Sequence, residues 1–184
     1  MDDFAKYEQV HNKVRTSDEF VLDQFEFLTG SELLAKYHEP LVFLYEEIIT
    51  TPSLVLLSGP SKKGKSWYIL HIANELRKAG HRICYLSKED NTRRLQSRYL
   101  TLGGIADDNI IFWAGLSNDK QLPKGKKAHI FLRAIKRKYD PKVIIIDTIA
   151  AIRDSNKKEN YASAEEEFSA LRKLSYELDI VIIC

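Results

Sequence analysis

The sequence has little that would commit it to a disulfide framework, a membrane or a secretory route. Its 184 residues include two cysteines, Cys84 within an apolar run and Cys184 at the last position, which fits a reducing compartment. The longest apolar stretch, residues 40–49, is too short to span a bilayer and contains two glutamates. The N-terminus lacks the basic and apolar segments of a signal peptide, so we expect a cytoplasmic protein with no membrane partner.

Charge and reactive motifs exclude further classes of function. The net charge is only +2, with 28 basic and 26 acidic residues, so the overall charge does not indicate a nucleic-acid partner. None of the five histidines has a partner at metal-binding spacing, and no zinc site is expected. A Gly-x-Ser-x-Gly motif and a Cys/His arrangement are both missing, which argues against a nucleophilic enzyme. The hydrophobic content of 44% suits one globular domain.

Apolar runs alternate with helical patterns along most of the chain. The expected strands are 53–58, 81–87, 109–115, 142–148 and 180–184, and the expected helices are 65–80, 91–104, 129–140 and 164–179. This alternation predicts an α/β fold with a doubly wound, mostly parallel sheet. We expect residues 1–27 to be an arm and residues 28–184 to be the domain. A helix capped by Ser31 and interrupted at Pro40 is expected to extend to residue 49.

A phosphate-binding loop lies between the first of these strands and the first long helix. The motif G-x-x-x-x-G-K-[ST] is matched by Gly59, Pro60, Ser61, Lys62, Lys63, Gly64, Lys65 and Ser66. The two glycines allow successive N–H groups to turn toward one centre, and the helix adds the positive end of its dipole. Lys65 would reach the β- and γ-phosphates of a nucleotide, and Ser66 would bind Mg²⁺.

Carboxylates at the ends of two other strands suit the same site. Asp147 ends the run "VIIID", and the carboxyl end of such a strand is where open α/β sheets bind their ligands. Asp147 is therefore the expected second Mg²⁺ ligand beside Ser66. Glu89 and Asp90 end the strand 81–87; Asp90 is the better candidate to cap the next helix, near Asn91, which leaves Glu89 to activate water.

Four segments carry a resemblance to a known family: "LLSGPSKKGKS", "ICYLSKEDNTRRLQSRYLTLGG", "VIIIDTIAAI" and "AEEEFSALRKLSYELDIVIIC". Over roughly residues 28–184 the chain resembles RecA-like P-loop ATPases, and more narrowly the AAA-type ATPases of plasmids and phages related to the replicative helicase RepA. The resemblance implies that Lys65 and Glu89 are catalytic and that Glu89 is the base. It also implies ATP and Mg²⁺ as cofactors, ATP hydrolysis, a homo-oligomeric ring and work on single-stranded DNA.

The chain departs from that family at its C-terminal strand. In RecA-like ATPases the strand corresponding to residues 180–184 lies between the phosphate-loop strand and the strand of the metal-binding aspartate, and it ends in a polar sensor residue. Here the sequence ends at Cys184, so we expect a truncated core that lacks the sensor and the last strands. Hydrolysis and ring assembly are then in doubt, and the phosphate-loop strand should have an uncovered edge.

Basic and aromatic side chains are open to two interpretations. Three basic groups could contact DNA phosphates: Arg93, Arg94 and Arg98; Lys124, Lys126 and Lys127; Arg133, Lys136, Arg137 and Lys138. A solvated helix face is favoured for the last group. Loop 153–161, with Lys157 and Lys158, lies where the family has a DNA-facing loop. Trp67 is assigned to the nucleotide site, although an aromatic there more often packs on the sheet.

Two alternatives to a DNA-directed ATPase stay open. A small-molecule or nucleotide kinase would need an arginine-rich lid, and the long loop 116–127 contains lysines but no arginine. A nucleotide-responsive module that binds DNA or a partner without turnover would need only the phosphate loop and Asp147.

Overall fold

The computed structural model describes residues 24–153 and 161–184. It divides the chain into two compact units, residues 1–40 and 41–184. The predicted boundary after residue 27 falls inside the first unit. In that unit the helix α3, Gly30–Ala35, begins with a capping box in which Thr29 and Glu32 bond each other's backbone N–H. The N-cap is therefore Thr29 and not the predicted Ser31.

The prediction of a helix that continues to residue 49 is wrong beyond Ala35. Residues of this stretch form strand β1, Val42–Tyr45, which pairs antiparallel with β2, Ile49–Thr51. Pro40 separates the two structures, and the strands are rich in the aromatic and β-branched residues that fit a pleated surface. Leu44 and Ile49 are buried against the core of the larger unit, so tertiary packing decides the conformation here.

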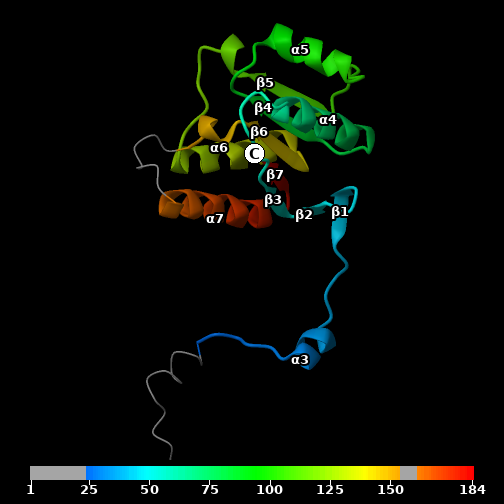
Figure 1. Cartoon of the computed structure of the whole chain (residues 1–184), viewed down its shortest axis with the longest axis vertical. Helices are drawn as coiled ribbons and strands as arrows, with labels where there is room; N and C mark the ends of the chain where they lie inside the picture. The colour runs from blue at the N-terminus through cyan, green and yellow to red at the C-terminus, as the bar shows by residue number, and fades with distance from the viewer. Residues whose placement is uncertain (1–23, 154–160) are drawn as a thin grey trace, which may run out of the picture. The chain divides into compact units, whose positions relative to one another are not determined.

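A five-stranded parallel sheet forms the centre of the larger unit (Figure 1). Its strands in spatial order are β3 (Ser53–Val55), β7 (Val181–Ile183), β6 (Val143–Asp147), β4 (Ile83–Ser87) and β5 (Ile110–Ala114). Each neighbouring pair is parallel. The predicted α/β class is confirmed, and β7 lies between β3 and β6, as the resemblance implies. Among the described strands β3 pairs only with β7, so its other edge is uncovered.

Four helices cover the two faces of this sheet (Figure 1). They are α4 (Lys65–Lys78), α5 (Thr92–Thr101), α6 (Lys126–Tyr139) and α7 (Tyr161–Leu178). Helices α4 and α5 share a core cluster with Val143 and Ile145 of β6, whereas α6 and α7 share one with Ile144 and Ile146. Successive side chains of a strand point to opposite faces, so β6 contributes to both cores and is buried on both.

Both cysteines belong to this interior. Cys84 and Cys184 are buried free thiols, and burial raises the pKa of each to about 12. Their side chains therefore act as small apolar groups of the core.

A close backbone approach lies beside the carboxyl end of β4. A Cβ atom added at Gly115, just after β5, would lie 2.6 Å from the carbonyl oxygen of Lys88. Lys88 is itself held by a hydrogen bond from its N–H to the carbonyl oxygen of Asp147, at 2.8 Å. Only a residue without a side chain fits at position 115 without moving this backbone.

We expect Gly115→Ala to lower the free energy of unfolding by about 1–3 kcal/mol, because the backbone of Lys88 must shift. Urea unfolding followed by circular dichroism measures the change. Gly30→Ala is the matched control, since a Cβ atom added there would have nothing within 4 Å, and it should change the free energy by less than ~0.5 kcal/mol. Equal effects of the two substitutions would contradict the steric explanation.

Candidate active site

The phosphate loop connects β3 to α4 with the backbone conformation that its glycines permit. Gly59 has φ of 156° and Gly64, the N-cap of α4, has φ of 85°. A residue with a Cβ is strained in this region, which accounts for glycine at both positions. The loop residues between them are exposed, so the amino end of the 14-residue helix α4 faces an accessible site.

Lys65 is folded back over this loop. Its ammonium group donates hydrogen bonds to the carbonyl oxygens of Gly59 and Pro60, at 2.6 and 2.8 Å. The two bonds keep the first turn of the loop next to the first turn of α4. They also hold a positive charge beside the loop, as a site for phosphate requires.

Asp147 lies at the carboxyl end of β6 and is buried. The hydroxyl of Tyr85, on β4, donates a hydrogen bond to its Oδ2 at 3.1 Å and lies 3.4 Å from the carbonyl oxygen of Ser66. Burial raises the pKa of the Tyr85 phenol and the charge of Asp147 raises it further, so the hydroxyl keeps its proton and remains a donor. Tyr85 thus links the two predicted metal ligands, a role that sequence inspection missed.

The side chains of Glu89 and Asp90 have different environments. Glu89 is exposed, whereas Asp90 is buried. The prediction that Asp90 caps α5 is wrong; Asn91 is the N-cap, and its side chain accepts a hydrogen bond from the N–H of Arg94 at 2.8 Å. The carboxylate of Asp90 is therefore available for other partners.

Asp90 is instead the buried centre of an ionic cluster. Its Oδ2 accepts a hydrogen bond from the guanidinium of Arg98 at 2.7 Å and from the hydroxyl of Ser87 at 3.2 Å. Arg94 contributes a second guanidinium, 3.5 Å from Oδ1. The spacing of Asp90, Arg94 and Arg98, one and two helical turns apart, is the sequence signal that could have predicted this cluster.

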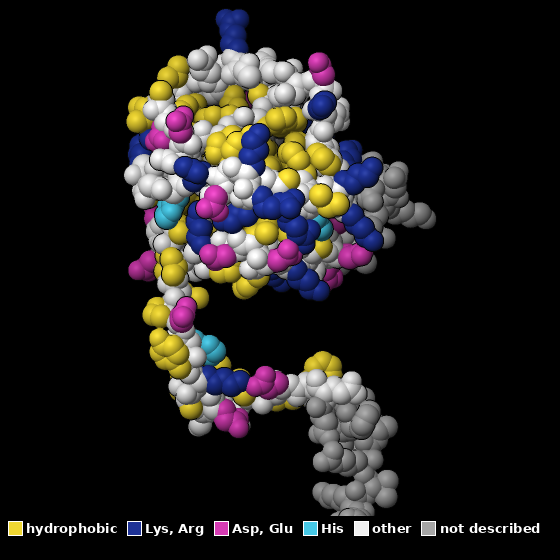
Figure 2. Space-filling model, turned by 180° about the vertical axis from the view of Figure 1, so that it is seen from behind, with side chains coloured by type: hydrophobic (Ala, Val, Ile, Leu, Met, Phe, Trp, Pro, Cys, Tyr) yellow, Lys and Arg dark blue, Asp and Glu magenta, His cyan; other side chains and the backbone are white. Residues whose placement is uncertain are grey.

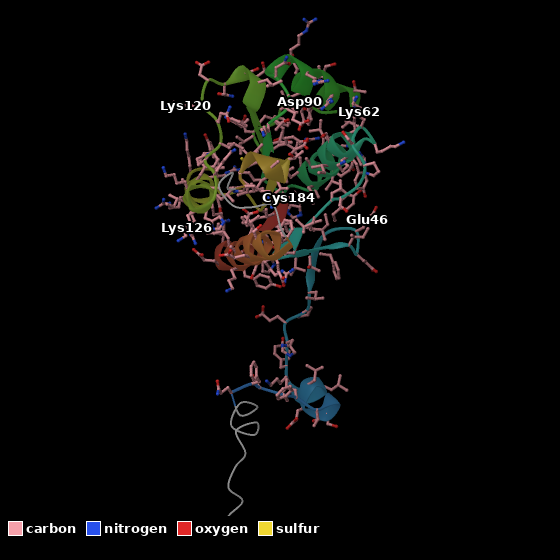
Figure 3. The ribbon with its side chains drawn as sticks, turned by 60° about the vertical axis from the view of Figure 1, so that its left-hand side comes forward. Glu46, Lys62, Asp90, Lys120, Lys126 and Cys184 are labelled. Atoms are coloured by element: carbon pink, nitrogen blue, oxygen red, sulfur yellow. The ribbon has the colours of Figure 1, made fainter. Side chains whose placement is uncertain are left out.

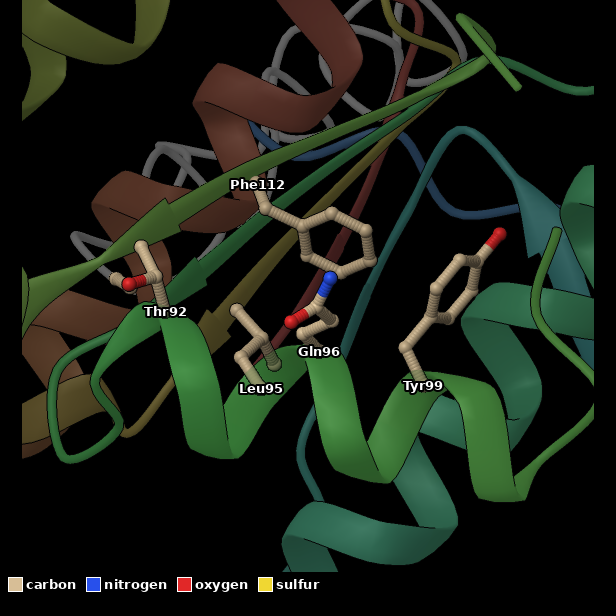
Figure 4. A pocket seen from close by; sticks show the side chains of 6 residues that line it. Thr92, Leu95, Gln96, Tyr99 and Phe112 are labelled. Carbon is tan, nitrogen blue, oxygen red and sulfur yellow. The ribbon is translucent and has the colours of Figure 1, made fainter. Parts of the chain in front are cut away.

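The two faces of helix α5 have different surroundings. One face lines a pocket of about 190 Å³ against β5, formed by Thr92, Leu95, Gln96, Tyr99, Phe112 and Ala114 (Figure 4). There the ring of Tyr99 packs edge-on against that of Phe112, with centroids 5.1 Å apart, and its hydroxyl donates to the carbonyl oxygen of Ile105. The other face directs Arg94 and Arg98 toward the phosphate loop.

The loop, the strand ends and α5 enclose a cleft of about 670 Å³. Lys62 and Asp90, both labelled in Figure 3, come from the phosphate loop and the end of β4. Its lining includes most of the predicted site: Gly59, Ser61, Lys62, Gly64, Lys65, Ser66, Trp67, Glu89 and Asp147. The predicted Pro60 and Lys63 are not among the lining residues, and Arg94, Arg98 and Thr148 are additional ones.

The donor set at this cleft fits Mg²⁺. The ion prefers oxygen ligands and is usually held by one or two carboxylates, a hydroxyl and the phosphates of its nucleotide rather than by a full protein cage. Ser66 and Asp147 supply such a hydroxyl and carboxylate at one cleft. In the described parts of the chain no cluster of three or more His, Cys, Asp or Glu side chains could hold a metal without a nucleotide.

Two members of the basic group on α6 form ordinary surface pairs. Arg133 and Lys136 of α6 pair with Glu177 and Asp140, at 2.6 and 2.5 Å. Figure 2 shows the Lys and Arg side chains of one face interspersed with acidic ones. The predicted DNA-facing lysines, Lys157 and Lys158, lie outside the described residues. Among the helices that the structure describes, none is long and apolar enough to cross a membrane.

Comparisons with known proteins agree with this geometry. The sequence model of the AAA domain family matches residues 22–184. The structure is similar to that of a KaiC-like protein from the hyperthermophilic archaeon Pyrococcus horikoshii OT3, with a TM-score of 0.56 and 18% identity, covering 78% of this chain and 71% of that one. This likeness shows the fold alone, a five-stranded parallel sheet between two layers of helices. A search of curated proteins found no match.

The ionic cluster around Asp90 leads to a prediction about the free energy of unfolding. We expect Asp90→Ala to lower the free energy of unfolding by about 3–5 kcal/mol, because it leaves the largely buried guanidinium of Arg98 without its carboxylate. Glu177→Ala, which removes the exposed partner of Arg133, is the control and should cause little change. Chemical unfolding of both variants compares them; a similar small loss in each would contradict a structural role for the cluster.

Proposed function

The chain belongs to the AAA domain family, and from this membership and the geometry of the cleft we propose that it binds ATP with Mg²⁺ and hydrolyses it. The observation that carries the proposal is the meeting of Lys65, Ser66, Glu89 and Asp147 at one cleft beside the phosphate loop. These four side chains come from α4 and from the ends of β4 and β6, far apart in the sequence.

Binding uses the amino end of α4 and its loop. The loop N–H groups and the Lys65 ammonium bind the β- and γ-phosphates, and Lys65 exchanges its bonds to Gly59 and Pro60 for bonds to phosphate oxygens. Ser66 and Asp147 hold Mg²⁺, which neutralises phosphate charge when it is bound. The hydrogen bond from the Tyr85 hydroxyl keeps the Asp147 carboxylate oriented at the cleft.

Hydrolysis needs a carboxylate that can accept a proton from water, and Glu89 is the one we assign. Its side chain is exposed in the cleft, while the neighbouring Asp90 is buried and committed to Arg98 and Ser87. A carboxylate already bonded by two donors is a poor proton acceptor, whereas an open one can orient and deprotonate water. Lys65 and the loop N–H groups stabilise the charge that develops on the phosphate.

We place this activity among cytoplasmic RepA-type ATPases that assemble into rings and act on single-stranded DNA in replication or recombination. The motif "YLSKEDNTRRLQSR" supports this narrower assignment, since it is the segment most specific to that family. Arg93, which follows Glu89 and is exposed, is available to a DNA or subunit partner, and Arg94 is exposed beside it although it also pairs with Asp90. Stimulation of ATP turnover by single-stranded DNA is the measurement that tests the DNA partner.

The central test is ATP turnover by two variants. We expect Glu89→Gln to keep ATP affinity and to lose about 10²–10⁴-fold in the hydrolysis rate, because the general base is removed. Lys65→Ala should lose both nucleotide affinity and, by about 10²-fold or more, turnover. Phosphate release and equilibrium binding of a fluorescent ATP analogue measure the two effects.

Lys78→Ala, at the opposite end of α4, is the control and should behave as the wild type. Absence of ATP and ADP binding by the wild type would refute the proposed function. Binding without hydrolysis, with or without DNA, would show a nucleotide-responsive module, and phosphate transfer to a small acceptor would show a kinase.

Tyr85→Phe tests how Asp147 is held. We expect this variant to need roughly tenfold more Mg²⁺ for half-maximal thermal stabilisation by ADP, because loss of a hydrogen bond to a carboxylate costs about 1.5–3 kcal/mol. Tyr99→Phe is a matched control: it also loses a hydroxyl and its ring also packs on Phe112, but its partner is the carbonyl oxygen of Ile105. An identical Mg²⁺ requirement in the two variants would show that Tyr85 has only a structural role.

A further inference from the structure

Trp67 does not pack into the core, although aromatic residues in the first turn of such a helix usually do. It is 39% exposed and lines the cleft directly after Ser66. The guanidinium of Arg98 lies over its indole ring, 5.5 Å from the centroid. One face of the ring is thus occupied by a cation, and the rest of its exposed surface belongs to the cleft wall.

The orientation of the indole ring is restrained by Arg98, which packs on it. Arg98 is bonded to Asp90 at 2.7 Å, and the Asp90 side chain is only 3% exposed. The guanidinium therefore has little freedom, and cation–π attraction holds the indole ring above it. An exposed aromatic ring with a fixed orientation is a preorganised surface, which loses little entropy when a flat ligand stacks on it.

Trp67 also lies between two clefts of the surface. Besides the cleft at the phosphate loop, a neighbouring cleft of about 570 Å³ is lined by Trp67, Arg94 and Arg98 together with Asn91, Arg93 and Ser97. The three shared residues form the wall common to both clefts. The second cleft thus combines an aromatic ring with guanidinium planes and amide and hydroxyl groups.

We propose that Trp67 is the stacking platform for the nucleotide base and that this neighbouring cleft is the base subsite. The inference rests on the proposed function, because it requires the phosphates of the same nucleotide to lie on the loop. Trp67 directly follows Ser66 in α4 and lines the same cleft, so its ring is next to the place proposed for the phosphates. Bases stack on aromatic side chains and on arginine planes, and both are present here.

The polar groups of the base subsite could bond the edge of a stacked base. Asn91 and Ser97 offer donors and acceptors at the edge of a stacked base, and Arg93 and Arg94 are exposed donors. Stacking itself tolerates any base because every base has a π-face. Recognition of phosphate is therefore dominant over recognition of the base, and a purine is favoured only because its larger ring covers more of the indole.

Tryptophan fluorescence gives a direct test, because the chain has only two tryptophans. Trp113 packs against the core on the other sheet face, so Trp113→Phe leaves Trp67 as the sole reporter. We expect ATP to quench this fluorescence and inorganic tripolyphosphate, which has no base, to bind without comparable quenching. Equal quenching by the two ligands, or none by ATP when ATP binding is shown by thermal stabilisation, would overturn the assignment.

Affinities provide the second test. Trp67→Ala should weaken ATP binding by roughly five- to hundredfold, as loss of one stacked base does, and leave tripolyphosphate binding within about twofold. Tyr68→Ala is the matched control: Tyr68 is the next residue of the same turn, is also exposed and does not line either cleft.

The outcomes separate the two proposals. If the wild type binds neither ATP nor tripolyphosphate, the proposed function fails. If it binds both and Trp67→Ala weakens them equally, or weakens only binding of single-stranded DNA, the proposed function stands and the base subsite is overturned.

Discussion

The burial of strand β6 on both faces is the constraint on which the rest of the structure depends. Val143 through Ile146 are fully buried between two helical layers, so the strand cannot shift by one residue without exchanging its two apolar faces. Its register with β4 sets Ser87 beside Asp147. The carboxyl ends of β4 and β6 therefore meet next to the loop that follows β3, and the cleft forms where those ends converge.

Within that frame, two adjacent carboxylates have different environments. Asp90 is buried and paired with arginines from α5, while Glu89 is exposed in the cleft. Charge compensation at Asp90 stabilises the junction of β4 and α5, and the same junction presents Glu89 to the site. One residue thus supports the backbone that the other needs.

The sequence predicts those parts of the fold and site that depend on local pattern. The phosphate loop, α4, the order of strands and helices after residue 53 and the carboxyl-end positions of Glu89 and Asp147 follow from spacing and hydrophobic period. The stretch 31–49 contains several Leu and Glu residues, which favour a helix, but burial of Leu44 and Ile49 in a hairpin outweighs that preference. Local pattern contains no information about such long-range packing.

Two side chains at the cleft depart from what their residue types usually do. Asp90 resembles a helix cap because helix starts favour Asp, yet its actual partners are arginines from the next two turns. Trp67 resembles a core residue because large apolar rings are usually buried, yet Arg98 holds it at the cleft. Both exceptions involve one guanidinium, which bonds Asp90 at one side and covers Trp67 at the other. On the proposed assignments, Arg98 therefore joins the two ends of the nucleotide site, since Asp90 adjoins Glu89 at the γ-phosphate and Trp67 lies under the base. Substitution of Arg98 would remove the contacts at both ends at once, the ion pair to Asp90 and the cation–π contact to Trp67.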